Sequence, residues 1–389
     1  MIRARRTTLL AAIAIAIVPA AALVAGCGSS DSSSSTAAST ATVPANSISI
    51  AAEGPLTGDQ ASNGQDMLNG VQLAADQVNA QGGVLGKQIN VIPVDDQADP
   101  ATGKIVAQQT VDQGDAVAVI GPYNSAVGIA NLSIYKTGGM AIVRMTSDDK
   151  TAGDGITVQP MNSQISPVEI NYISGLAPAK VSMLVDPSAY TQSMATRLKD
   201  GLSKQGVNVT SIAITPGGTD YTTQVQLALT NNPEVVYSST YFPEGGLIAK
   251  ALATATGNTA QCFMGLANQD PGFMKVSGLA DAQKCVFSGV PSPESFSGAA
   301  TYSTDYQAAF GKAPGTWGTF TYDSANVLFA AITKAGSVDP AAIQNALNTT
   351  SGFKGITGTI TVEPGTGNRQ DPPVKILKVQ SNTSFVVQP

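Results

Sequence analysis

Short apolar runs alternate with helix-sized intervals along most of the chain. Between the first two runs, Met67, Val71, Ala74, Ala75 and Val78 recur at helical spacing, which predicts an amphipathic helix ending at Gln81-Gly82-Gly83. The apolar runs predict nine strands, at residues 48–52, 89–94, 117–120, 141–143, 181–185, 209–214, 235–237, 262–264 and 285–287. Two successive βαβ series of this kind predict two α/β domains.

The loops that follow the strands are where a binding site is expected. Open sheets of this class bind ligands beyond the carboxyl ends of their strands. Two such sheets that face one another would form a cleft between them.

Composition agrees with two domains and narrows the function. The chain has 389 residues, 43% of them hydrophobic, which is enough for two cores. Only 12% are charged and the net charge is -6, which argues against a nucleic-acid partner. The sequence contains no His, so the commonest general base and metal ligand and every Ser/His/Asp device are excluded. An enzyme is not excluded by this absence, but its easiest catalytic routes are.

The N-terminal residues have the pattern of an export signal. Arg3, Arg5 and Arg6 precede an apolar run over residues 9–24 that is short for a membrane span. The run ends in Val24-Ala25-Gly26-Cys27, which resembles a bacterial lipobox; the alternative is an ordinary signal peptide with a chance Cys. We expect residues 1–26 to be removed, Cys27 to carry a lipid, and residues 28–46, rich in Ser, Thr and Ala, to form a flexible tether. The protein would then be extracytoplasmic and anchored to the cell membrane.

Two further cysteines remain, Cys262 and Cys285. Each begins a predicted strand, and one helix-sized interval separates them, so the two strands should be neighbours in a parallel sheet. In an oxidising compartment we predict a disulfide between them. Two unpaired buried thiols are the alternative, and a metal site with two Cys and no His is remote.

The loops themselves carry a recognisable series. Glu53-Gly54-Pro55-Leu56-Thr57-Gly58 follows the first strand, Asp95-Asp96-Gln97-Ala98-Asp99-Pro100 the second, and Gly121-Pro122-Tyr123-Asn124-Ser125 the third. In order and spacing they resemble the periplasmic leucine/isoleucine/valine-binding protein family, the substrate-binding components of ABC importers. Asp95, Asp96 and Asp99 lack the spacing of a calcium loop, so we expect them to be solvated capping residues.

The resemblance implies a fold and a division of the chain. It implies a two-lobed clam-shell of type I, each lobe a mostly parallel α/β sheet flanked by helices, with three hinge crossings. The first lobe would comprise residues 47–165 and 292–355, and the second residues 166–291 and 356–389. Members close over a small ligand, and a membrane permease recognises the closed form. No bond is made or broken in this process, so the resemblance implies a binding protein that uses no metal or cofactor, and not an enzyme. We expect a monomer whose partners are the small ligand and the permease.

The resemblance also implies site residues. A Ser that binds the ligand carboxylate corresponds to Ser125, beside the Ala126 N–H; Ser125 could instead cap a helix. Thr146 and Ser147 correspond to the hydroxyl positions of the next loop. Tyr190 and Tyr241 correspond to cleft aromatics of the second lobe, with ordinary packing as the alternative. Trp317 would be a pocket, core or hinge residue.

Two departures from the family bear on the ligand. The family's carboxylate for the ligand ammonium is replaced by Ala267, so Asp148, Glu244 or Asp270 would have to substitute, or the ligand has no α-ammonium. Asn63 stands where relatives often carry an aromatic residue, which indicates a more polar or differently shaped ligand. We expect an importer's binding lipoprotein for a branched-chain amino acid or a related solute. A tethered sensor of small amides or carboxylates is the alternative, and the lack of His weighs against a secreted hydrolase.

Overall fold

The computed structural model describes residues 46–296 and 299–388. The predicted signal segment, the lipidation position Cys27 and the tether over residues 28–46 fall outside this range, except for Asn46. In the described residues, no helix combines the length and apolarity that a bilayer crossing requires.

Two sheets and one hairpin make up the strands. The first sheet is wholly parallel, in the order β2-β1-β3-β4. The second has the order β13-β12-β9-β8-β7-β5-β6 and is parallel except for β12 and β13 at one edge. The strands are β1 (Ser47–Gly54), β2 (Gln88–Asp95), β3 (Ala116–Ile120), β4 (Ala141–Val143), β5 (Lys180–Val185), β6 (Asn208–Ala213), β7 (Val235–Ser239), β8 (Gln261–Met264), β9 (Cys285–Gly289), β10 (Phe353–Gly355), β11 (Gly358–Ile360), β12 (Lys375–Val379) and β13 (Phe385–Val387).

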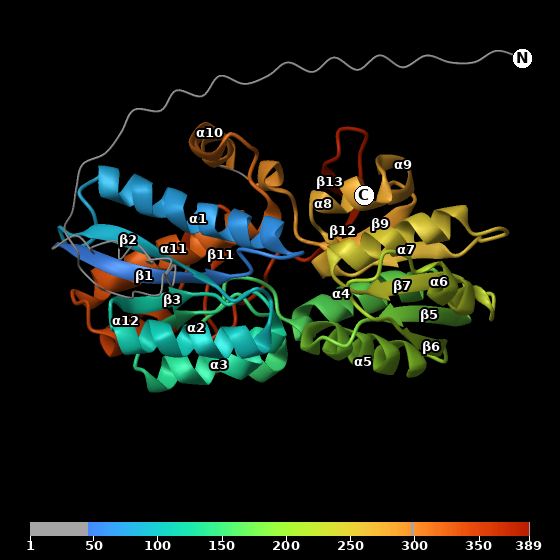
Figure 1. Cartoon of the computed structure of the whole chain (residues 1–389), viewed down its shortest axis with the longest axis horizontal. Coiled ribbons are helices and arrows are strands. Elements are labelled where there is room, and N and C mark those ends of the chain that lie inside the picture. The colour runs from blue at the N-terminus through green and yellow to red at the C-terminus, as the bar shows by residue number, and fades with distance from the viewer. Residues whose placement is uncertain (1–45, 297–298, 389) are drawn as a thin grey trace, which may run out of the picture. The chain divides into compact units, whose positions relative to one another are not determined.

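Helices cover both faces of each sheet, as Figure 1 shows. We call the first sheet with α1–α3, α10–α12 and the β10-β11 hairpin the first lobe, and the second sheet with α4–α9 the second lobe. The helices are α1 (Ala61–Ala80), α2 (Pro100–Gln113), α3 (Ser125–Thr137), α4 (Asn162–Gly175), α5 (Ala189–Ser203), α6 (Thr222–Leu229), α7 (Phe242–Thr254), α8 (Gly272–Ser277), α9 (Leu279–Ala282), α10 (Ala299–Phe310), α11 (Thr316–Ala335) and α12 (Pro340–Asn348). The predicted α/β architecture with two lobes is confirmed.

The alternation of side chains along β1 builds two cores in the first lobe. Ile48 and Ile50 point to the face that α1 and α11 cover, where Met67 and Phe320 pack on them. Ala51 points to the opposite face, covered by α2 and α3. The predicted amphipathic helix is therefore α1, and it ends as expected at Gln81.

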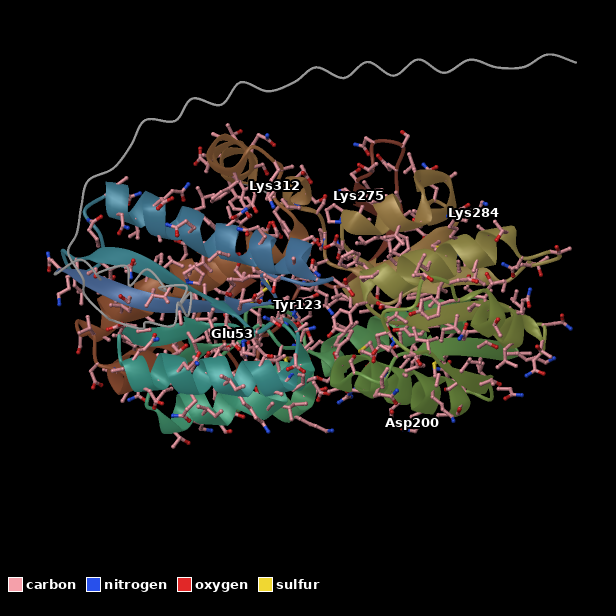
Figure 2. The ribbon with its side chains drawn as sticks, in the orientation of Figure 1. Glu53, Tyr123, Asp200, Lys275, Lys284 and Lys312 are labelled. Carbon is pink, nitrogen blue, oxygen red and sulfur yellow. A yellow bond between two sulfur atoms is a disulfide. The ribbon has the colours of Figure 1, made fainter. Side chains whose placement is uncertain are left out.

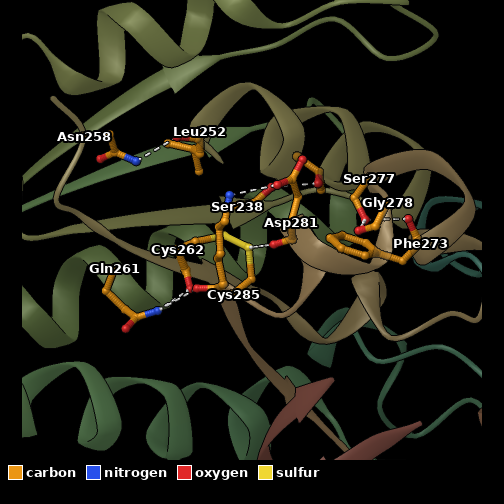
Figure 3. The surroundings of a disulfide bond; sticks show 12 residues. Ser238, Leu252, Asn258, Gln261, Cys262, Phe273, Ser277, Gly278, Asp281 and Cys285 are labelled. Atoms are coloured by element: carbon orange, nitrogen blue, oxygen red, sulfur yellow. Dashed lines mark hydrogen bonds and ion pairs between the residues drawn. A yellow bond between two sulfur atoms is a disulfide. The ribbon is translucent and has the colours of Figure 1, made fainter. Parts of the chain in front are cut away.

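The predicted disulfide is present in the second sheet. Cys262 on β8 is directly opposite Cys285 on the parallel neighbour β9, and their sulfur atoms are 2.05 Å apart. Figure 3 shows the bond between the two strands, close to Asp281 of α9, whose carbonyl oxygen lies 3.7 Å from Cys285 Sγ. The disulfide therefore links two neighbouring strands that α8 and α9 connect along the chain.

The chain crosses between the lobes three times, and the third crossing lies later than predicted. Ile360 and Val362 are buried in the first lobe's core, and the fully buried Arg369 donates hydrogen bonds to the Thr357 and Thr359 carbonyls. Residues 356–369 therefore pack with the first lobe, and we place the third crossing after Arg369 instead of at 355/356. The first crossing also falls earlier than 165/166, because α4 packs on α5 and β9 of the second lobe. These short polar segments contain no long apolar run that could have marked either boundary.

Candidate functional site

A small cavity lies where the loops after the strands of both sheets meet. Its volume is about 20 Å³, which leaves room for a water molecule, so a larger solute has to separate the lining side chains or the lobes. Residues from both lobes and from the first crossing line it: Tyr123, Ser125, Met145, Ser147, Gln159, Tyr190, Tyr241, Leu266, Ala267 and Trp317. A larger open groove lies beside β4 and α12 of the first lobe, with a lining that includes Lys136, Gln344 and Glu363, and its walls come from the first lobe and the segment after it.

Four aromatic rings form most of the cavity wall. Tyr123, labelled in Figure 2, follows β3, and its ring centroid lies 5.5 Å from that of Trp317 on α11. Tyr190 and Tyr241 come from the second lobe, and their centroids are 5.9 Å apart. Tyr123 also meets Tyr241 edge to face at 6.4 Å, so the aromatic contact crosses from one lobe to the other. The rings pack directly on one another, so a solute body has to separate them in order to lie between them.

The beginning of α3 provides the polar end of the cavity. Ser125 is the first residue of α3, and the Asn124 side chain before it does not cap the helix. The Ser125 hydroxyl oxygen accepts hydrogen bonds from the N–H groups of Ser147 (3.3 Å) and Asp148 (3.1 Å), so its own proton is free to be donated. Helix N–H groups of the first turn have no partner inside the helix and carry partial positive charge. This end of the cavity favours an anion.

Gln159 lines the cavity from the first crossing and is fixed in orientation. Its side-chain Nε2 donates to the Met145 carbonyl oxygen and to Ser147 Oγ (3.0 Å), while the Ser147 hydroxyl donates to the Pro160 carbonyl oxygen (2.8 Å). Because Met145 O accepts only and the Ser147 proton is used, the amide nitrogen must occupy this position. Gln159 Oε1 and the Tyr190 hydroxyl are buried and have no hydrogen-bond partner in the described structure. Burial raises the pKa of Tyr190 well above its ordinary value, so this hydroxyl remains protonated.

The structure brings six of the nine predicted ligand positions to the cavity. Asn63, Ala126 and Thr146 lie outside the lining, because Thr146 Oγ1 pairs with Thr151 Oγ1 at 2.7 Å and Ala126 lies behind the first residue of α3. The residues that line it as predicted are Ser125, Ser147, Tyr190, Tyr241, Ala267 and Trp317.

Four lining residues were not predicted, although a signal existed for three of them. Tyr123, Met145 and Leu266 lie in the loops after β3, β4 and β8, where the sequence predicts a binding site. Gln159 reaches the cavity only because the chain crosses there, and nothing in its neighbourhood in the sequence indicated it.

The three acids that could replace the missing carboxylate do not line the cavity. Asp148 Oδ1 accepts from the Lys150 N–H (2.9 Å), and Glu244 Oε1 accepts from the Gly217 N–H (3.0 Å). Asp270 accepts from the Gly272 N–H (2.5 Å) and lies 3.5 Å from the Ser62 hydroxyl. Burial raises the pKa of all three, that of Asp270 to about 6. Over the described residues, no group of three acidic or cysteine side chains is arranged to hold a metal ion.

Comparison with known proteins supplies the family. A family model described as periplasmic binding protein matches residues 47–384. The Leu/Ile/Val-binding protein BraC3 of Rhizobium johnstonii is 31% identical over 54% of this chain, which spans only 59% of that protein's length. Leu/Ile/Val-binding protein homolog 2 of Brucella abortus is 28% identical over 81% of this chain and 86% of its own.

Solved structures agree on the fold. The leucine-binding protein LivK of Thermotoga maritima superposes with a TM-score of 0.80 at 22% identity, covering 88% of this chain and 98% of that one. LivJ of Streptococcus pneumoniae, solved with isoleucine, gives 0.80 at 22% identity over 88% and 99%. The fold is thus that of type I periplasmic binding proteins. Relatives named as Leu/Ile/Val-binding proteins are among its matches, and the chain belongs to the periplasmic binding protein family.

Proposed function

We propose that this protein is the solute-binding component of an ABC importer. It would be held outside the cell by a lipid on Cys27 and by the tether over residues 28–46. It captures a small solute between its lobes and delivers it to a membrane permease. The single observation that carries the proposal is the cavity at the carboxyl ends of both sheets, with walls supplied by both lobes.

Direct contacts between the lobes support closure over the solute. Besides the Tyr123–Tyr241 contact, Arg197 on α5 forms an ion pair with Asp149 after β4, with 2.8 Å between Nη2 and Oδ2. These contacts exist only while the lobes are together, so a solute that bridges the cavity would shift the population toward the closed state.

The role proposed is binding and not catalysis. The chain has no His, and its cavity offers hydroxyl, amide and aromatic groups in place of a nucleophile with a base. The relatives' names describe binding proteins. Solved structures with a similar fold to this chain include proteins crystallised with isoleucine, leucine and 3,4-dihydroxybenzoic acid, so the fold is compatible with more than one solute class.

Thermal unfolding of the purified protein, freed of carried-over solute, tests the proposal. A panel of amino acids, small amides and amine-free carboxylates is added in turn. A ligand at a hundred times its dissociation constant adds about 2.7 kcal/mol to the free energy of unfolding. We expect at least one solute to raise the melting temperature, and Tyr241→Ala to abolish that rise. A rise that survives in both Tyr241→Ala and Ser125→Ala would place the solute outside this cavity and contradict the proposal.

A further inference from the structure

The cavity offers hydrogen-bond donors for an anion at one end, and its lining contains no acidic side chain for a cation. The α3 N-terminus and the free Ser125 proton provide donors for a carboxylate. None of the ten lining residues is Asp or Glu. Ala267 lies on the wall opposite Ser125, at the position that corresponds to the family's carboxylate for the ligand ammonium. A buried ammonium group without an anion costs several kcal/mol, by the order of magnitude of charge burial.

Neutral acceptors do not replace the missing carboxylate. The Met145 carbonyl and the Ser147 hydroxyl oxygen lie beside Ser125 and would be the natural acceptors for an α-ammonium. Both already accept from Gln159 Nε2, and the Ser147 proton is directed at Pro160. Gln159 thus presents a donor where an ammonium group needs acceptors.

Two polar atoms remain for other parts of a ligand. Gln159 Oε1 and the Tyr190 hydroxyl are buried, line the cavity and have no partner in the described residues. A hydroxyl group on the ligand can donate to Gln159 Oε1 and pair with Tyr190, which removes the cost of leaving them unpaired. The four aromatic rings of the lining pack on one another, and a planar body that enters between them would replace these contacts with offset and edge-to-face contacts of its own.

We infer that the solute is an amine-free carboxylate with an aromatic, hydroxyl-bearing body. This inference rests on the proposed solute-binding function and names the substrate class of the same cavity. The carboxylate binds at Ser125 and the start of α3. The ring lies among Tyr123, Tyr190, Tyr241 and Trp317, and its hydroxyl reaches Gln159 Oε1.

Calorimetric titration with matched pairs tests the missing ammonium group. Each pair shares a carbon skeleton: 3-(4-hydroxyphenyl)propanoate against tyrosine, 3-phenylpropanoate against phenylalanine, and 4-methylpentanoate against leucine. We expect the amine-free member to bind at least about tenfold more tightly in each pair, and the hydroxyl-bearing aromatic acid to bind best. Tighter binding of the amino acids would overturn the inference and leave the proposed function intact. Binding of no compound from any solute class would overturn both.

A variant pair at Ala267 tests the cause. Ala267→Glu introduces a carboxylate into the lining, and Ala267→Gln has nearly the same volume without the charge. We expect the Glu variant to bind leucine or phenylalanine at least about tenfold more tightly than the Gln variant, and to lose the amine-free acid. Equal preferences in the two variants would contradict a charge-based selection. The two variant side chains have nearly the same volume, so any loss of folding caused by their size appears in the Gln variant as well. If both variants fail to fold, the titrations of the wild-type protein with the matched pairs still test the inference.

Discussion

Ser125 is the residue on which recognition of a carboxylate depends. Its oxygen accepts from the Ser147 and Asp148 N–H groups, which directs its proton toward the cavity. Hydrogen bonds to charged groups contribute about 1.5–3 kcal/mol, so Ser125→Ala should weaken binding of the solute about 10- to 150-fold. Calorimetric titration measures this, with Ser133→Ala on the exposed face of the same helix as control. Unchanged affinity in the Ser125 variant would remove it from the site.

Glu53 and Asp96 form a buried acidic pair behind the carboxyl ends of β1 and β2. Asn131 Nδ2 donates to Glu53 Oε1 at 2.6 Å, and the Ala98 N–H donates to Asp96 Oδ1 at 2.8 Å. Burial, followed by the nearby Asp96, raises the pKa of Glu53 well above its ordinary value, and burial raises the pKa of Asp96 to about 7. Asp96 was predicted to be solvated and is fully buried, so that prediction was wrong.

A pH dependence of stability follows from this pair. Between the ordinary carboxyl pKa and the raised values, the folded state binds more protons than the unfolded state, so stability falls as pH rises. We expect the free energy of unfolding to be lower at pH 8 than at pH 5, and Glu53→Gln to reduce that difference. Urea unfolding at both pH values measures it, with Asp200→Asn on the exposed face of α5 as control. The same pH difference in wild type and Glu53→Gln would contradict this explanation.

At the scale of elements, the contact between α1 and α11 holds the first lobe's outer layer on its sheet. Asp66 on α1 accepts hydrogen bonds from the Gly315 and Gly318 N–H groups at the start of α11. The helices approach so closely at Gly70 that an added Cβ atom would lie 2.0 Å from the Gly318 carbonyl oxygen and 2.6 Å from Thr321 Oγ1. Only glycine fits this crossing without a shift of backbone.

Gly70→Ala therefore should destabilise the protein by about 1–3 kcal/mol, the usual cost of overpacking. The matched control is Gly175→Ala at the end of α4, where an added Cβ atom has no neighbour within 4 Å and the change should be neutral or stabilising. Urea unfolding of both variants gives the comparison. Equal stability of the two would show that the helices can separate at no cost.

The strands were predictable because buried parallel strands are continuous apolar runs. All nine predicted runs coincide with β1–β9, apart from Ile214, which lies one residue beyond β6. The last four strands were missed because β10 and β11 form a short, partly exposed hairpin and β12 and β13 lie at a sheet edge. In the cavity, Met145 and Ser147 face inward while Thr146 faces Thr151, since side chains alternate in extended chain. A shift of one residue in the alignment therefore changes which of these side chains is predicted to face the cavity, and the sequence alone does not determine that shift.

At the scale of the whole described molecule, function depends on walls that neither lobe supplies alone. Tyr123, Ser125 and Trp317 belong to the first lobe, and Tyr190 and Tyr241 to the second. A solute that touches both walls adds its own contacts to those already made between the lobes, such as the Tyr123–Tyr241 and Arg197–Asp149 contacts. Affinity should therefore follow both the direct contacts and the population of the closed state.

Trp317 makes the most direct test possible without any substitution. It is the only tryptophan in the chain, and it lines the cavity against Tyr123. The measurement is a titration of Trp317 fluorescence with each solute that raises the melting temperature. Our account predicts a saturable change in emission whose midpoint equals the dissociation constant from calorimetry. A solute that stabilises the protein while the emission of Trp317 remains constant would bind elsewhere, and the assignment of this cavity as the binding site would be wrong.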